Sequence, residues 1–258
     1  MLQTKIVFFD IDGTLIDMQA KKITPKMLET LHRLQDRGIK ICIATGRSPM
    51  VLPKIDGVAF DAYLTFNGSL CYDRKGVIFS NPIPHKDVVR FIQNAAALGR
   101  PVCVSTRDRL AANGTDTDLT DYFFIANEPV PVADDFDAVC AEDIYQLMLG
   151  CRPKDYPALL DGAPGAKIAA WWDRAVDVIP AGGGKGIGIE KMLAYYGLDK
   201  AEALAFGDGN NDREMLQAVG TGVAMENGSP ELKALADEIC GPVYEDGIYH
   251  YCADKGLI

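Results

Sequence analysis

The sequence predicts an α/β protein, a doubly wound parallel sheet into which a smaller α+β domain is inserted. Short apolar runs alternate with helical patterns in the first third of the chain and again after residue 184, as in a parallel sheet covered by helices. Between about residues 82 and 180 the pattern changes to paired strands with few helices. The chain has 258 residues, 48% of them hydrophobic, which is enough for one large domain or two modest ones.

The elements of the first part follow from its apolar runs and the residues that interrupt them. A strand is expected at 5–10, where KIVFFD is almost wholly apolar. Thr24 and Pro25 form the pattern of an N-cap followed by a first-turn proline, and Gly38 ends the helix expected at about 24–37. The other elements expected here are strands at 39–44 and 62–66 and a hairpin in SLCYDRKGVIFS that turns at Asp73–Gly76.

The insert is bounded by NPIP (81–84) and IPAGGG (179–184), both with the composition of hinges. We therefore assign residues 1–81 and 181–258 to a core and residues 82–180 to the insert. Expected within the insert are a helix at 85–98, strands near 101–106 and 109–113, a polar, acidic stretch, a strand at 145–150, a short helix near 154–161, and strands at 166–172 and 175–179. Expected after it are a helix at 185–196, strand 202–206, helix 211–218, strand 221–225, helix 230–236, strand 237–240 and a helix near 246–254.

Composition excludes several classes of partner. The net charge of −10 disfavours nucleic acids and anionic membranes, because both require a basic surface. We expect a cytoplasmic protein, since the sequence has no secretory signal and no apolar run of roughly 18 residues. The seven cysteines include no C-x-x-C pair, which favours reduced, buried thiols over disulfides or zinc. No obligate protein partner is evident.

Polar residues follow three of the expected strands. Asp10 and Asp12 follow the first, Thr45-Gly46-Arg47 follow the second, and GDGNND (207–212) follows the strand at 202–206. In a Rossmann-like parallel sheet, ligands bind beyond the carboxyl ends of the strands, where the helices also begin. Lys185, at the start of its helix, therefore belongs to the same edge.

This set of residues suits a phosphate and a metal ion. Two carboxylates about 4 Å apart repel by about 4 kcal/mol at an effective dielectric constant of 20, so Asp10 and Asp12 need a cation between them. Glycine-rich turns and helix amino termini bind anions, typically phosphate. Mg²⁺ couples carboxylates to a phosphate, and we therefore expect Mg²⁺ as cofactor.

Four motifs carry a resemblance to a known family. The stretches D-x-D-G-T (10–14), A-T-G-R (44–47), G-K-G (184–186) and G-D-G-x-N-D (207–212) resemble, in order and spacing, those of the haloacid dehalogenase superfamily. The insert between the second and third motifs is similar to that of the Cof-type (type IIB) phosphatases, although it is compact. The motif positions show no departure from the pattern.

The resemblance implies a role for each residue. Asp10 would be the nucleophile that forms an aspartyl-phosphate, and Asp12 the general acid and then the general base. An acid/base aspartate at position 12 favours phosphoryl transfer over dehalogenation. Lys185 would place its charge on the nucleophile and the phosphoryl oxygens; the alternative, a solvated lysine, is electrostatically unfavourable at a helix amino terminus.

The remaining roles concern the metal and the phosphate. Asp208 would bind the metal beside Asp10 and the backbone carbonyl of Asp12, while Asp212 would hold a metal-bound water or Lys185. The other implied phosphate ligands are the Thr45 hydroxyl, the backbone at Gly46, and Asn211. Arg47 would bind the phosphate or the substrate body, or would be a surface arginine. For the aspartates and for 207–212, capping of turns and helices is the competing interpretation.

The resemblance predicts a Mg²⁺-dependent phosphomonoester hydrolase that acts on a small phosphorylated metabolite such as a sugar phosphate. The insert would be a cap domain that selects the substrate. Its candidate residues are Arg107, Arg109, Trp171, Trp172 and Asp173, although two adjacent tryptophans in a strand point to opposite faces, which places one in the core. A phosphotransferase similar to phosphomannomutase stays open as an alternative, as does a non-catalytic phosphate-binding regulator.

Overall fold

A computed structural model of the chain describes residues 4–125, 127–170 and 172–258. The chain divides into two compact units. The first comprises Met1–Arg47, Pro53–Ser80 and Gly184–Ile258, and the second comprises Ser48–Leu52 and Asn81–Gly183. Division of labour between them, with a catalytic core and a substrate-selecting cap, stays a prediction.

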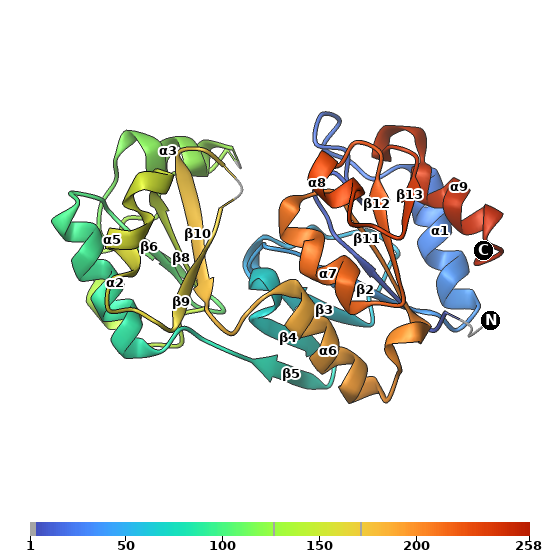
Figure 1. Cartoon of the computed structure of the whole chain (residues 1–258), viewed down its shortest axis with the longest axis horizontal. Coiled ribbons are helices and arrows are strands. Elements are labelled where there is room, and N and C mark those ends of the chain that lie inside the picture. The colour runs from blue at the N-terminus through green and yellow to red at the C-terminus, as the bar shows by residue number, and fades with distance from the viewer. Residues whose placement is uncertain (1–3, 126, 171) are drawn as a thin grey trace. The chain divides into compact units, whose positions relative to one another are not determined.

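The first unit is built on an eight-stranded sheet (Figure 1). In spatial order its strands are β13 (Glu238–Cys240), β12 (Thr221–Met225), β11 (Ala203–Gly207), β1 (Ile6–Phe9), β2 (Lys40–Ala44), β3 (Ala62–Thr65), β4 (Leu70–Asp73) and β5 (Gly76–Ser80). The strands from β13 to β3 are parallel, and the hairpin β4–β5 extends the sheet in the antiparallel sense. The α/β fold class with its parallel sheet is confirmed.

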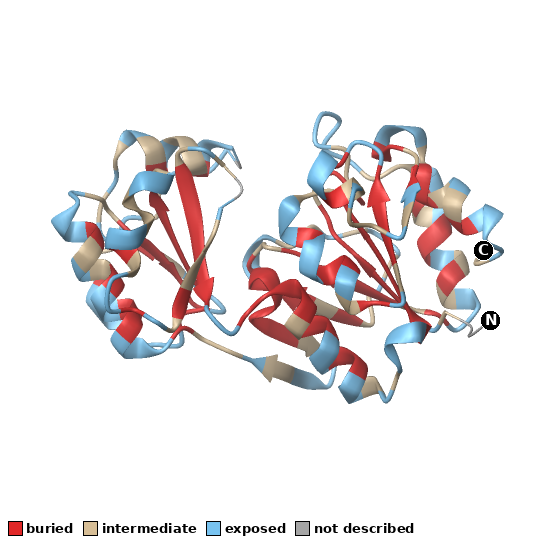
Figure 2. Ribbon diagram, in the orientation of Figure 1, coloured by how far each residue is buried: buried red, intermediate tan, exposed pale blue. Residues whose placement is uncertain are grey.

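Helices cover both faces of this sheet. Side chains of α6 (Lys185–Tyr196), α7 (Arg213–Ala218) and α8 (Pro230–Lys233) pack on one face, in a core that includes Phe8 and Ala205. On the other side α1 (Pro25–Asp36) packs against β2 and against α9 (Gly247–Asp254). The central strands β1, β2, β11 and β12 are buried almost throughout, whereas the edge strand β5 is half-buried or exposed (Figure 2).

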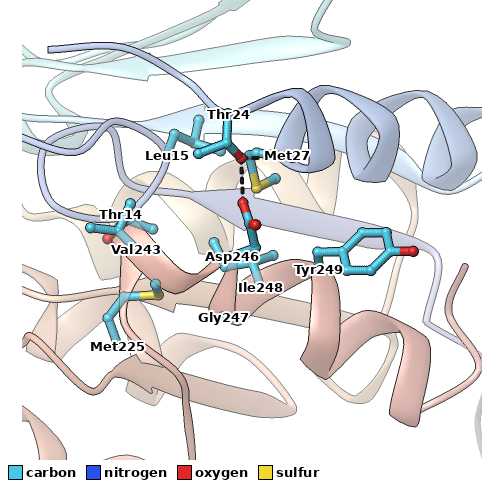
Figure 3. A pocket seen from close by; sticks show the side chains of 10 residues that line it. All are labelled: Thr14, Leu15, Thr24, Met27, Met225, Val243, Asp246, Gly247, Ile248 and Tyr249. Carbon is cyan, nitrogen blue, oxygen red and sulfur yellow. Dashed lines mark hydrogen bonds between the residues drawn. The ribbon is translucent and has the colours of Figure 1, made fainter. Parts of the chain in front are cut away.

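The N-terminus of α1 has the cap expected from its sequence. The Thr24 hydroxyl accepts a hydrogen bond from the Met27 amide at 3.1 Å, and it donates one to Asp246 at 2.5 Å, just before α9 (Figure 3). The cavity beside this contact has a volume of only about 10 Å³, which holds about one water molecule at most. We therefore regard it as a joint between two helices and not as a ligand site.

The second unit contains a five-stranded antiparallel sheet. In spatial order its strands are β7 (Leu110–Ala112), β6 (Cys103–Ser105), β8 (Gln146–Gly150), β10 (Ala175–Pro180) and β9 (Ala166–Ala169). One face packs against α2 (His85–Ala97), α4 (Phe136–Val139) and α5 (Tyr156–Leu160), and α3 (Thr117–Phe124) covers part of the other.

Helices α3 and α4 lie in the acidic stretch, where the sequence led us to expect no element. Asp116 caps α3 by accepting a hydrogen bond from the Leu119 amide at 2.8 Å. Leu119 and Phe123, one helical turn apart, are the residues that α3 buries, and the neighbouring Asp118 and Asp121 concealed this short apolar pattern.

Several expected elements are shorter than the sequence suggested, among them the first strand of the insert, which spans Cys103–Ser105 instead of about 101–106. Strand β9 ends at Ala169 instead of continuing to residue 172, so Trp172 is not a strand residue; Trp171 lies outside the described residues. Helix α8 ends at Lys233 and not at residue 236. All seven cysteines are free and buried, as expected. In the described part of the chain, no helix has the length and apolar character needed to cross a membrane.

Candidate active site

The carboxyl edge of the parallel sheet in the first unit gathers the polar residues of the four motifs. Asp10 follows β1, Thr45 follows β2, and Asp208 follows β11, which pairs with β1. Lys185 is the first residue of α6. Parallel register alone therefore brings together segments that are separated by up to about 200 residues of sequence.

A buried ion cluster lies at the centre of this edge. The ammonium group of Lys185 donates hydrogen bonds to Asp10 Oδ1 at 2.7 Å and to Asp212 Oδ1 at 2.5 Å. The side chains of Lys185 and Asp212 are both 0% exposed. Burial alone would lower the pKa of the lysine, but the charges of Asp10 and Asp212 outweigh this effect and raise the pKa above its ordinary value. Lys185 is therefore a fixed positive charge beside Asp10.

Asp212 organises the loop that follows β11. Its Oδ2 accepts hydrogen bonds from the amides of Asp208 and Gly209 at 3.0 and 2.9 Å, while its Oδ1 accepts from Lys185. Both of its oxygens therefore already have donors. This geometry fits the supporting role that the resemblance implies for Asp212 and leaves little capacity for direct binding of a metal.

Three carboxylates in this site lie close enough to share a cation. One oxygen each of Asp10, Asp208 and Asp212 lies within 4.8 Å of the others. Burial raises the pKa of Asp10 well above its ordinary value, and burial reinforced by the charge of Asp212 raises the pKa of Asp208 to about 7. Carboxylate oxygens are the ligands that Mg²⁺ prefers, so these residues fit such an ion. Since Asp212 is engaged elsewhere, Asp10 and Asp208 are the side chains that would hold it.

Asp12 and Arg47 form a second ion pair at this edge. The guanidinium of Arg47 binds both carboxylate oxygens of Asp12, with Nε to Oδ2 at 2.8 Å and Nη2 to Oδ1 at 2.6 Å. The hydrogen bonds with Asp12 raise the pKa of Arg47. The sequence suggested a phosphate, the substrate body or solvent as the surroundings of Arg47, and the structure adds Asp12 as its partner.

The remaining phosphate-ligand candidates lie in turns beside the cluster. Thr45 is buried, and its hydroxyl accepts a hydrogen bond from the Arg47 amide at 3.1 Å. The Asn211 side-chain amide donates to Oδ1 of Asn67 at 3.2 Å. A Cβ atom on Gly46 would lie 3.1 Å from this Asn67 side chain, so Gly46 stands directly against it.

Three further residues support the site and were missed in the sequence. The Thr14 hydroxyl donates to Asp208 Oδ1 at 3.0 Å, and the Asn227 amide donates to the Gly13 carbonyl at 2.8 Å. The third residue is Asn67. The sequence held a signal for two of the three residues. Thr14 lies inside the first motif, and Asn67 belongs to an N-G dipeptide after β3, whose carboxyl end lies at the same edge.

The substrate-selection candidates of the insert have partners within the second unit. Arg109 forms a two-pronged ion pair with Asp135, at 2.7 and 2.5 Å, on the surface. The Arg174 guanidinium lies 4.8 Å from the centre of the Trp172 ring and binds Asp173 at 3.2 Å. Arg107 lies 3.9 Å from Asp108. Their role in substrate selection stays a prediction.

Comparison with known proteins gives consistent matches over nearly the whole chain. A family model described as haloacid dehalogenase-like hydrolase matches residues 7–252. YkrA of Bacillus subtilis (strain 168), a protein that carries the name of a phosphatase, is 34% identical over 259 residues, and the alignment covers 100% of each chain.

Solved structures of the same superfamily are also similar. The structure of the phosphatase BT1666 from Bacteroides thetaiotaomicron has a TM-score of 0.92 at 30% identity and covers 99% of this chain and 96% of its own. The sugar phosphatase BT4131, of subclass IIB, has a TM-score of 0.88 at 28% identity and covers 99% of this chain and 100% of its own.

Proposed function

The chain is a phosphatase of the haloacid dehalogenase-like hydrolases, and we propose that it hydrolyses phosphomonoesters of small metabolites. In this proposal the reaction passes through an aspartyl-phosphate on Asp10, and Mg²⁺ is the cofactor. The observation that carries the proposal is the buried cluster in which Lys185 binds both Asp10 and Asp212. Phosphate binding alone would not require a nucleophilic carboxylate fixed in this way.

Asp10 provides the attacking oxygen. Lys185 binds Oδ1 of Asp10 at 2.7 Å, which orients the carboxylate and screens part of its charge from an approaching phosphate. The new bond joins a carboxylate oxygen of Asp10 to phosphorus as the bond to the leaving alcohol breaks. Thr45 and Asn211 hold oxygens of the phosphoryl group in this proposal.

Asp12 transfers the protons. It protonates the leaving oxygen and then accepts a proton from the water that cleaves the aspartyl-phosphate. Because Arg47 binds both oxygens of Asp12, this pair has to loosen before Asp12 can give up or take a proton. The pair also fixes the orientation of the Asp12 side chain.

Asp10 and Asp208 would hold the Mg²⁺ ion, together with the backbone carbonyl of Asp12. When bound, the ion supplies positive charge that reduces the repulsion between the Asp10 carboxylate and the anionic phosphate. Thr14 and Asp212 hold Asp208 in place: the Thr14 hydroxyl donates to its carboxylate, and Asp212 accepts from its backbone amide.

We propose a sugar phosphate as the favoured substrate class. The structure of BT4131, named a sugar phosphatase, covers 99% of this chain, including the insert. The second unit would select the leaving group, because the phosphoryl group is common to all substrates and only the remainder of the molecule differs. A screen of phosphorylated metabolites for phosphate release would identify the substrate.

The test of the mechanism is Asp10→Asn, with phosphate release from an aryl phosphate in the presence of Mg²⁺ as the readout. We expect kcat to fall by more than about a thousandfold. Acid quenching of the wild-type reaction should yield a peptide phosphorylated at Asp10. The matched control is Asp118→Asn, which changes a carboxylate in the second unit and should leave kcat for this small substrate unchanged.

Two results would count against the proposal. Turnover by Asp10→Asn at the wild-type rate would refute the covalent mechanism. A ratio of released phosphate to released alcohol that falls below one when a sugar phosphate is added would indicate a phosphotransferase, since the phosphoryl group would then pass to the added sugar instead of water.

A further inference from the structure

We propose that Asn67, in the turn after β3, is a positioning residue of the active site, which orients the Asn211 amide and fixes the turn at Thr45 and Gly46. The inference rests on the proposed function of this site. Asn67 belongs to none of the four motifs from which the site was predicted.

The backbone around Asn67 is strained. Phe66, Asn67 and Gly68 have φ angles of 50°, 51° and 91°, so three consecutive residues lie in the left-handed region. Two of them are not glycine, and such residues adopt this conformation at a cost in free energy and persist in it only where the surrounding structure imposes it. A Cβ atom on Gly68 would lie 2.2 Å from the carbonyl oxygen of Gly184, so the turn also packs directly against the residue before Lys185.

Hydrogen bonds tie this strained turn to the second motif. The Phe66 amide donates to the carbonyl of Arg47 at 3.0 Å, and the Asn67 amide donates to the carbonyl of Thr45 at 3.0 Å. The turns after β2 and β3 therefore form one connected unit. A change in the conformation of residue 67 would move the backbone that carries the Thr45 hydroxyl.

The Asn67 side chain extends the connection to the fourth motif. It is 5% exposed, and its Oδ1 accepts the hydrogen bond from Asn211 Nδ2 at 3.2 Å. Both terminal atoms of the Asn67 amide lie 3.1 Å from the position of a Cβ atom on Gly46, so the amide lies against this glycine. The buried Asn67 amide thus contacts both segments to which we assign phosphoryl binding. The hydrogen bond between the two side chains leaves the second Nδ2 hydrogen of Asn211 and its Oδ1 available to a ligand.

A simpler role for Asn67 is that of a turn residue, because asparagine tolerates the left-handed conformation better than most residues. The two roles make different demands on the side chain. Asn67→Gly keeps the left-handed backbone accessible and removes only the amide, so it would preserve a simple turn and impair a positioning residue. Asn127→Gly is the matched control, since Asn127 has φ 58° and is exposed in the second unit.

The experiment measures kcat and KM for an aryl phosphate, competitive inhibition by inorganic phosphate, and thermal unfolding. We expect Asn67→Gly to lower kcat/KM about tenfold or more, by analogy with other residues that orient a ligating side chain. It should weaken inhibition by inorganic phosphate while Tm stays close to that of Asn127→Gly. The double variant Asn67→Gly/Asn211→Ala should lose less than the product of the two single losses, because part of the effect of Asn67 passes through Asn211.

Wild-type kcat/KM in Asn67→Gly would overturn the inference. A double variant whose loss equals the product of the two single losses would also overturn it, since the two residues would then act independently. If the wild-type protein releases phosphate from no ester, the proposed function fails instead. Calorimetric titration with inorganic phosphate in the presence of Mg²⁺ then decides the inference: weaker binding by Asn67→Gly supports it, and equal binding overturns it.

Discussion

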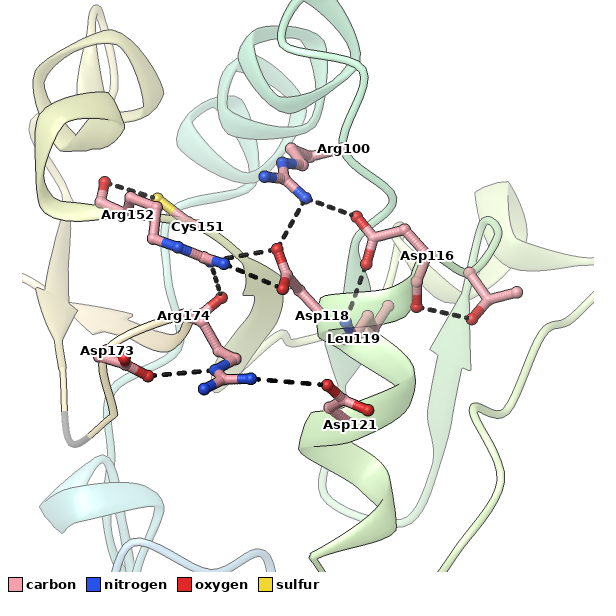
Figure 4. A network of polar contacts seen from close by, with 10 residues as sticks. Arg100, Asp116, Asp118, Leu119, Asp121, Cys151, Arg152, Asp173 and Arg174 are labelled. Carbon is pink, nitrogen blue, oxygen red and sulfur yellow. Dashed lines mark hydrogen bonds and ion pairs between the residues drawn. The ribbon is translucent and has the colours of Figure 1, made fainter.

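Each of the two compact units contains a cluster of ion pairs, and the two clusters use the same kinds of group in opposite surroundings. In the first unit, Lys185 is held between Asp10 and Asp212 with no exposed side-chain surface. In the second unit, Arg100 and Arg152 bind Asp118 at 3.0 to 3.1 Å, and the Arg152 side chain is 38% exposed (Figure 4). The buried cluster has more carboxylates than cations. The residues of the second cluster are only half-buried, and we call it the exposed cluster because solvent reaches it and screens its charges.

The comparison distinguishes ion pairs that only connect parts of the fold, in the second unit, from a cluster that can bind a ligand, in the first. The two arginines of the exposed cluster join α3 to the segments before β6 and after β8, and contact with solvent makes each ion pair worth little. In the buried cluster, desolvation strengthens every attraction and every repulsion, so three carboxylates beside one lysine leave negative charge uncompensated. A fold keeps such an arrangement where a ligand completes it.

Replacement of the cation should give the largest difference between the two clusters. Lys185→Met leaves Asp10 and Asp212 buried without their partner, which should lower the free energy of unfolding by about 3–5 kcal/mol in the presence of a chelator. The counterpart Arg100→Met leaves Asp116 and Asp118, the partners of Arg100, accessible to water, so it should lower the free energy of unfolding much less. Urea unfolding followed by circular dichroism measures both.

The two tryptophans, at positions 171 and 172, belong to the range of the second unit, so their fluorescence reports on that unit separately. The Lys185→Met variant should shift the dichroism transition and leave the fluorescence transition in place. Equal losses of unfolding free energy in Lys185→Met and Arg100→Met would show that burial does not distinguish the two clusters.

Addition of Mg²⁺ should give an intermediate effect, confined to the buried cluster. An ion that binds only the folded state stabilises it by about 2.7 kcal/mol at a hundred times its dissociation constant. We expect Mg²⁺ to raise Tm of the wild-type protein, and Asp208→Asn to abolish this shift because it removes one charged ligand. Asp118→Asn, the matched change in the exposed cluster, should keep the full shift. A similar shift in Asp208→Asn would place the ion elsewhere.

The smallest effect is expected from acid titration of the exposed cluster. Hydrogen bonds from Arg152 hold the pKa of Asp118 below its ordinary value. A carboxyl with a lowered pKa stabilises the fold above its unfolded pKa of about 4, and this contribution disappears as the pH falls through the folded pKa. The difference in Tm between wild type and Asp118→Asn should therefore be small at pH 7, should decrease as the pH falls below about 4, and should vanish only below the folded pKa. A difference in Tm that increases as the pH falls would contradict this prediction.

The sequence predicted the position of most of the site because the geometry of a parallel sheet is general. Once β1, β2 and β11 are recognised, their carboxyl ends meet at one edge, and Asp10 and Asp208 have to lie near Lys185. Helix-capping residues predicted the boundaries of α1 and α6 almost to the residue. A proline in the first turn marks the start of α1, and a glycine follows the last residue of α6.

The features that the sequence did not predict depend on contacts between side chains or on unusual backbone angles. The pairing of Arg47 with Asp12 follows from two rotamers, which no spacing specifies. The left-handed conformation of the turn extends to Phe66, a residue type that disfavours it, so at this position the neighbouring segments impose it. Helix α3 was missed since its buried stripe consists of only two residues.

The isolation of Lys185 also determines its covalent reactivity. Amines react with acylating agents as the uncharged base, and only where the reagent reaches them. Lys185 is 1% exposed, and the carboxylates that raise its pKa keep it protonated. Lys22 and Lys86, by contrast, are exposed, so an acylating agent can reach them. Acyl donors in the surrounding medium will therefore modify the surface of this protein first, and Lys185 will be among the last of its lysines to react.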